Sequence, residues 1–104
     1  MLEIYAREGF SLKENGLNEV VVSNRVALQL LEIFSELKIF ILGGDLYEKD
    51  TDHHFVNIYG DWYYEGNSFM ESIEVARNHL SQYENDLFVS FIFRGGYFVD
   101  MVTI

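Results

Sequence analysis

Ile39-Phe40-Ile41-Leu42-Gly43-Gly44-Asp45-Leu46-Tyr47 is the stretch of sequence that decides the fold. Its first four residues are all apolar and two of them are β-branched, a composition typical of a strand that is covered on both faces. We therefore expect Ile39 to Leu42 to lie in the middle of a sheet. The two glycines that follow allow a bulge or a positive φ, and either would turn the next side chains towards the surface.

A helix is expected before this strand, beginning near Asn18 or Ser23 and ending at Leu37. Ser23 or Asn24 can cap its first turn, while residues 20–22 would form a turn or extended chain ahead of it. Its apolar residues recur at helical spacing. They predict a buried stripe made of Val26, Leu30, Ile33 and Leu37, with Ala27 and Phe34 beside them.

After the central strand, residues 48–54 are polar and are expected to form an acidic loop. The alternation along residues 55–64 then predicts a single strand that pairs with the central one as an antiparallel hairpin. One face would be made of Val56, Ile58, Trp62 and Tyr64, and the other of Asn57, Tyr59, Asp61 and Tyr63.

A second helix is expected to follow Gly66-Asn67, because Ser68 and Glu71 have the spacing of a capping box. The helix should end near Asn85. Its buried stripe would be made of Phe69, Ile73, Ala76, Leu80 and Tyr83.

The last segment, residues 87–104, contains two apolar runs separated by Gly95-Gly96 and predicts a two-residue β-hairpin. In that register Arg94 would pair with Tyr97. Val89, Phe91, Phe93, Phe98 and Val102 would then share the face that lies on the helices, and Asp100 would fall among them. Together these elements predict one α+β domain over the 104 residues, in which two helices pack on one face of a largely antiparallel sheet of four to five strands.

The charge is the most informative bulk property, because 17 acidic residues against 7 basic ones give a net charge of −10. Nucleic acids and acidic membrane surfaces are therefore disfavoured as partners, since both are bound through clustered lysine and arginine. A basic protein partner is favoured instead. The absence of cysteine removes disulfides and thiolate chemistry, no apolar run is long enough for a membrane helix, and a cytoplasmic location is expected.

Two catalytic interpretations of the acidic residues are weaker. Metal binding would use the acids of the loop with His53 and His54, but adjacent histidines in an extended chain point to opposite faces and no calcium-loop spacing is present. A paired-carboxylate hydrolase would use Asp45 with Asp61 or Glu65. The sequence shows no nucleophile with a neighbouring base, so neither an enzyme activity nor a cofactor is expected.

Several short motifs together resemble the immunity protein 40 family of bacterial polymorphic toxin systems. The most specific is the central Ile41-to-Tyr47 run, and the resemblance extends over residues 9–93. The motifs are Gly9-Phe10-Ser11-Leu12, Gly16-Leu17-Asn18-Glu19, Ala27-Leu28, Ile41-Leu42-Gly43-Gly44-Asp45-Leu46-Tyr47, Asp61-Trp62-Tyr63 and the Ser72, Ala76 and Tyr83 pattern. Where this sequence has Phe40, the family pattern has proline.

The resemblance implies a non-catalytic inhibitor that binds the C-terminal domain of a cognate toxin, for example a nuclease with a cationic cleft. Acidic residues would guide and pair with such a partner, and exposed tyrosines would anchor it. The expected contact residues are Asp45, Tyr47, Glu48, Asp50, Asp52, Asp61, Tyr63 and Glu65. A regulatory protein-interaction module would share these physical features and differ only in its partner.

Overall fold

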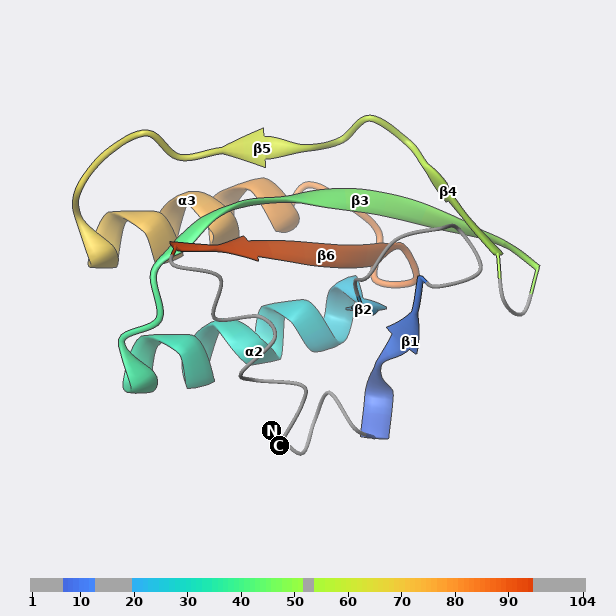
Figure 1. Ribbon diagram of the computed structural model, residues 1–104, viewed down its shortest axis with the longest axis horizontal. Helices are drawn as coiled ribbons and strands as arrows, with labels where there is room; N and C mark the ends of the chain where they lie inside the picture. Colours follow the sequence, from blue (N-terminus) through green and yellow to red (C-terminus); the bar gives the residue numbers. More distant parts are fainter. Residues whose placement is uncertain (1–6, 13–19, 52–53, 95–104) are drawn as a thin grey trace.

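The computed structural model describes residues 7–12, 20–51 and 54–94. Within these residues, six strands form a sheet in the order β1-β2-β6-β3-β4, with β5 paired to β3 beside β4, and every strand pair is antiparallel (Figure 1). The elements are β1 (Phe10–Ser11), β2 (Val20–Ser23), α2 (Asn24–Leu37), β3 (Ile41–Thr51), β4 (His54–Asn57), β5 (Trp62–Tyr63), α3 (Phe69–Leu80) and β6 (Phe88–Phe93). The expected α+β fold, with an antiparallel sheet and two helices, is confirmed.

The central strand is β3, which has β6 along one edge and β4 and β5 along the other. Ile41 is fully buried, as expected, but β3 begins only at Ile41, so Ile39 and Phe40 precede the strand, and Ile39 and Leu42 are half-buried. The pairing with β6 shifts register between Ile41 and Gly43, an irregularity just before the glycine pair, while Gly43 and Gly44 themselves pair regularly with Ile92 and Phe91. Neither Gly43 nor Gly44 has a positive φ, so that alternative is wrong.

The polar segment 48–54 is not the loop that the sequence predicted. The chain stays in β3 through Thr51, and Glu48 and Lys49 pair with Val56 and Phe55 of β4. Polar side chains do not prevent backbone pairing when a neighbouring strand offers its own donors and acceptors, so tertiary pairing overrides the local composition here.

Helix α2 begins after Ser23, whose side chain accepts a hydrogen bond from the backbone N–H of Val26 at 3.2 Å. It ends at Lys38, which adopts the left-handed conformation with a φ of 57°. The chain turns there, so Leu37 remains 55% exposed instead of completing the buried stripe. The residues of the helix that are fully or almost fully buried are Asn24, Val26, Ala27, Leu30, Leu31 and Phe34.

Helix α3 begins after Ser68, as predicted, and the Ser68 side chain accepts from the N–H of Glu71 at 3.2 Å. The other half of the expected capping box is replaced, because the N–H of Ser68 donates to the Tyr64 hydroxyl at 3.1 Å. The helix ends at Leu80, before the expected boundary at Asn85. Ile73, Ala76 and Leu80 are buried as predicted.

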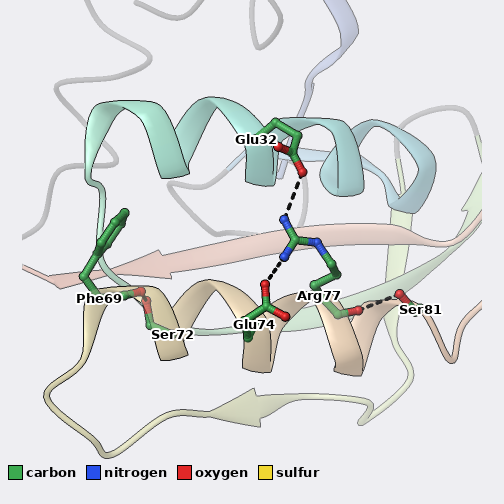
Figure 2. A network of polar contacts seen from close by, with 6 residues as sticks. All are labelled: Glu32, Phe69, Ser72, Glu74, Arg77 and Ser81. Carbon is green, nitrogen blue, oxygen red and sulfur yellow. Dashed lines mark hydrogen bonds and ion pairs between the residues drawn. The ribbon is translucent and has the colours of Figure 1, made fainter.

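The two helices pack against each other and share an exposed ionic contact. Figure 2 shows the Arg77 guanidinium between Glu32 of α2, at 2.9 Å, and Glu74 of its own helix. Exposed ion pairs of this kind contribute little to the free energy of folding. The main stabilisation is apolar: Phe34 of α2 meets Phe91 and Phe93 of β6 edge-on, with ring centroids 5.3 and 5.2 Å apart.

The predicted strand over residues 55–64 is broken into β4 and β5. Val56 pairs with Glu48 and Trp62 with Gly44, so both lie on one face of β3, as predicted; Val56 is 46% exposed there, whereas Phe55 on the other face is 2% exposed. Tyr59 then takes a positive φ of 58°, and after this break Trp62 and Tyr64 are buried while Tyr63 is exposed, as predicted. The break at Tyr59 therefore interrupts the strand but leaves Val56 and Trp62 on the same face of the sheet.

The sheet buries side chains on both of its faces. On the helix side, Leu46, Val89 and Phe91 join the helices in the main core. On the opposite face a smaller cluster is made of Leu12, Val21, Tyr47 and Phe55, with Phe88 packed against it. The predicted C-terminal hairpin, including Tyr97, Phe98, Asp100 and Val102, lies outside the described residues.

Candidate partner-binding groove

The hairpin of β3 and β4 projects past the ends of both helices (Figure 1). Leu46 and Glu48 point to the same side of β3 because strand side chains alternate with a period of two. Leu46 is fully buried in the helix-side core, whereas Glu48 is exposed, which marks where the helices end. The helix-side face of the hairpin is thereby left open.

An open groove of about 750 Å³ lies at this end of the molecule, between the hairpin and the segment that joins α3 to β6. Its apolar lining consists of Ile58, Leu87 and Phe88, all of them half-buried. Its charged lining consists of Glu48, Lys49, Glu84 and Asp86, all of them exposed. Ile58 and Leu87 also pack against the main core and the Phe88 ring against Phe10 and Phe55, so the apolar lining is held from below and the charged residues form the exposed rim.

The rim is acidic, because three carboxylates and one lysine give a local charge of −2. Among the described residues, none of the ion pairs involves Glu48, Glu84 or Asp86. The Lys49 ammonium lies 5.0 Å from the centre of the Phe10 ring, in a cation–π contact. Lys49 is the basic residue of the groove lining, so it balances only part of the negative charge of the three carboxylates.

A smaller pocket of about 240 Å³ continues from the groove along the hairpin. It shares Glu48 and Lys49 with the groove and adds Asp50 and the exposed side chain of Val56. Glu48 and Val56 are direct cross-strand partners, which explains why an acid and an apolar side chain lie together here.

The segment that carries Glu84 and Asp86 is fixed by Asn24 at the start of α2. The buried Asn24 side-chain amide donates to the backbone carbonyls of Leu80, Tyr83 and Glu84, at 2.9, 3.2 and 3.3 Å. The backbone N–H of Asn24 also donates to the carbonyl of Leu87 at 2.6 Å. Asn24 thus binds backbone carbonyls at both ends of the segment that carries Glu84 and Asp86.

A second acidic site lies on the other face of the sheet. The register that pairs Gly43 with Tyr63 and Gly44 with Trp62 leads on to Asp45 beside Asp61. Partial burial, and then the charge of Asp61, raise the pKa of the Asp45 carboxyl above its ordinary value. Tyr63 is 63% exposed on the same face, so an exposed aromatic ring accompanies this acid pair.

The structure thus separates the residues that the sequence predicted as one contact surface. Glu48 and Asp50 lie at the groove, and Asp45, Asp61 and Tyr63 lie on the opposite face. Glu65 is exposed in the segment between β5 and α3. Tyr47 is only 4% exposed within the smaller core, so its expected role as an exposed anchor is wrong, and Asp52 lies outside the described residues.

Sequence reasoning missed Glu84 and Asp86. Their signal was the polar run Glu84-Asn85-Asp86 between the second helix and the last strand, which is also where an ordinary connecting turn would be placed. Periodicity carries no information about which distant strand such a turn will face. Only the folded chain brings it opposite Glu48.

Of the residues in the metal interpretation, only some lie within the described ranges. Within the described ranges, no three histidine or acidic side chains come together as a metal site would need. The His54 imidazole lies 3.3 Å from the Asp50 carboxylate, and His53 lies outside the described residues. His79 instead hydrogen-bonds the backbone carbonyl of Gly60 at 2.6 Å and packs beside Trp62.

A family comparison matches this chain with immunity protein 40 over residues 11–93, a span that includes every strand and helix from β2 to β6. The chain belongs to the immunity protein 40 family. Comparisons of this family member with curated proteins and with solved structures gave no match. Across the described part of the chain, no helix combines the length and apolar character needed to cross a membrane.

Proposed function

We propose that this immunity protein 40 family member is a non-catalytic inhibitor that binds the C-terminal domain of a cognate bacterial toxin and neutralises it in the cytoplasm. The family match over residues 11–93 is the observation that carries this proposal. The net charge of −10 adds the chemistry of the partner, because it favours a toxin domain with a basic surface.

A basic toxin domain is attracted over distances comparable to the Debye length, which is about 10 Å at 0.1 M salt. Exposed acids then pair with its lysine and arginine side chains, and aromatic or apolar contacts exclude water around these pairs. For a nuclease toxin, the same cationic surface that would hold nucleic-acid phosphates is covered, so inhibition needs no chemistry by the immunity protein. The expected contact residues are Asp45, Glu48, Asp50, Asp52, Asp61, Tyr63 and Glu65.

Co-expression with the toxin C-terminal domain encoded immediately upstream tests this proposal. Growth of the producing cells and co-purification of the two chains are measured in parallel. We expect rescue from toxicity together with a stable complex, and an unrelated acidic protein of similar charge serves as the control. Absence of both rescue and complex would contradict the proposal, and rescue by the control would show that charge alone suffices.

A further inference from the structure

We propose that the groove between the β3–β4 hairpin and the α3–β6 segment receives a cationic segment of the toxin domain, one that carries lysine or arginine on either side of an apolar side chain. This inference rests on the proposed function and names the surface that performs it. The expected partner follows from the chemistry of the groove, whose half-buried lining is apolar and whose exposed rim is acidic.

The charges of the groove select a cationic partner. Glu48, Glu84 and Asp86 approach from two elements far apart in the sequence, and Asp50 extends the acidic line along the hairpin. Together with Lys49, these residues give a local charge of −3. An anionic partner would have to overcome this charge, whereas lysine or arginine side chains would replace the missing counter-charge.

The apolar lining selects the centre of the bound segment. Ile58, Leu87 and Phe88 are half-buried, so part of each side chain still contacts water in the free protein. A side chain of the partner that covers them removes this remaining apolar surface from water, at roughly 25 cal/mol per Å². An interface with an apolar centre and a charged rim has the arrangement in which single buried anchors carry most of the affinity.

Tyr59 offers an exposed aromatic ring next in sequence to a groove-lining residue. It follows Ile58 directly, is 87% exposed, and holds a positive φ of 58° that costs a non-glycine residue about 1–2 kcal/mol. The Asn57 side chain stabilises this conformation by accepting the N–H of Tyr59 at 2.7 Å. A strained and highly exposed tyrosine next to a groove-lining residue fits a contact residue better than a packing residue.

The groove is organised before binding. The Asn24 amide and the N-terminus of α2 hold the carbonyls of residues 80–87, so the loop bearing Glu84 and Asp86 does not have to order on contact. Preorganisation lowers the entropic cost of association, which otherwise reduces affinity by about 0.5–1.5 kcal/mol for each side chain that becomes fixed.

Affinity measurements with the upstream-encoded toxin domain test this inference. Glu84→Lys and Asp86→Lys reverse charges on the rim, and Glu36→Lys makes the same change on the exposed face of α2, away from the groove. We expect each rim variant to raise the Kd about tenfold or more, mostly through slower association. We expect Glu36→Lys to change the Kd less than about threefold, and Tyr59→Ala to raise it by faster dissociation.

Hydrogen exchange of the unmodified protein, free and in complex, provides a second measurement that needs no variant. Protection should appear in residues 46–50 and 84–88 if the groove is occupied. Kd values of the rim variants equal to that of Glu36→Lys, without this protection, would overturn the groove while leaving the toxin-binding function intact. A wild-type chain that neither binds the toxin domain nor rescues growth would overturn both.

Discussion

Gly43 and Gly44 are required by the close approach of neighbouring strands. A Cβ on Gly44 would lie 2.5 Å from the carbonyl oxygen of Ser90 and 2.6 Å from the ring of Trp62. One on Gly43 would lie 2.2 Å from the carbonyl oxygen of Trp62. Since these oxygens belong to the paired strands β6 and β5, they cannot move without separating the sheet.

We therefore expect Gly44→Ala to lower the free energy of unfolding by about 1–3 kcal/mol or more, as overpacking in a sheet does. Gly60→Ala is the matched control, because its Cβ would meet the ends of the Leu46 and Tyr83 side chains at 3.0 Å, and these can yield. Urea denaturation of both variants measures the difference. A loss for Gly44→Ala no larger than that for Gly60→Ala would contradict the explanation.

Asp45 illustrates a conflict between stability and binding. Its folded pKa is raised above its ordinary value of 3.8 by partial burial and by the charge of Asp61. The folded state then binds the proton more tightly than the unfolded chain, so stability falls as the pH rises from that value through the raised folded pKa, and the full loss is present at pH 7.

We expect Asp45→Asn to raise the Tm at pH 7, with a gain that shrinks as the pH falls through the raised folded pKa and is lost below 3.8. Glu36→Gln, which removes an exposed carboxylate from α2, is the control. Thermal unfolding across this pH range checks the sign. If the acid pair belongs to the toxin interface, the stabilised variant should bind less tightly. A Tm unchanged at pH 7 would contradict the raised pKa that burial and the charge of Asp61 give to Asp45.

At the scale of elements, the ends of the helices depend on contacts from outside the helices. Tyr64 replaces half of the capping box of α3 because its hydroxyl accepts the N–H of Ser68. The hydroxyl also interacts with the Glu71 carboxylate; burial and this carboxylate raise the pKa of Tyr64 above its ordinary value. The segment after β5 is thereby joined to the start of the helix that follows it.

Asn24 links three elements, since it starts α2 and binds the end of α3 and the loop that precedes β6. We expect Asn24→Ala to lower the free energy of unfolding by about 1–3 kcal/mol, because buried carbonyls lose their donor. Asn24→Asp should cost more, and increasingly so at higher pH, because a carboxylate would face carbonyl oxygens and repel them.

Chemical denaturation of the two Asn24 variants at pH 5 and pH 8 separates these effects. Hydrogen exchange should also become faster at residues 84–88 in Asn24→Ala, since the loop loses its attachment. An Asn24→Asp variant as stable as Asn24→Ala at both pH values would show that the side chain is not confined among acceptors.

At the scale of the whole molecule, the negative charge should govern how fast the toxin domain is found. We expect the association rate to fall roughly tenfold or more from low to high salt, while the dissociation rate changes less. The double variant Asp50→Lys with Asp52→Lys should associate more slowly and depend less on salt. Stopped-flow mixing at several ionic strengths measures both, and unchanged kinetics would place the interface away from the hairpin.

The sequence predicted the elements whose causes are local. Ser23 and Ser68 were recognised as caps because a cap binds an N–H within the next three residues, and apolar spacing located the buried sides of both helices. The alternation of Trp62 and Tyr64 with Tyr63 was equally visible. The acidic character of the surface was also evident, because it depends on composition alone.

The candidate site was less predictable. Alternation could not reveal that Phe55 is buried and Val56 exposed, because Phe55 is covered by a cluster that includes Leu12 and Val21 from distant segments, while Val56 pairs with the exposed Glu48. The burial of Tyr47 depends on Leu12 and Val21, which reach it from distant segments. The groove could not be predicted, because Glu48 and the pair Glu84 and Asp86 come together only in the folded chain.

The sequence by itself determined the fold class, the caps and buried sides of the helices, the central strand and the charge, because each follows from short-range periodicity or from composition. Only the tertiary structure decided the length of the β3–β4 hairpin, the burial of Tyr47 and the groove between this hairpin and the α3–β6 segment. These depend on pairing and packing between residues far apart in the chain, where a backbone partner or a neighbouring side chain outweighs local preference.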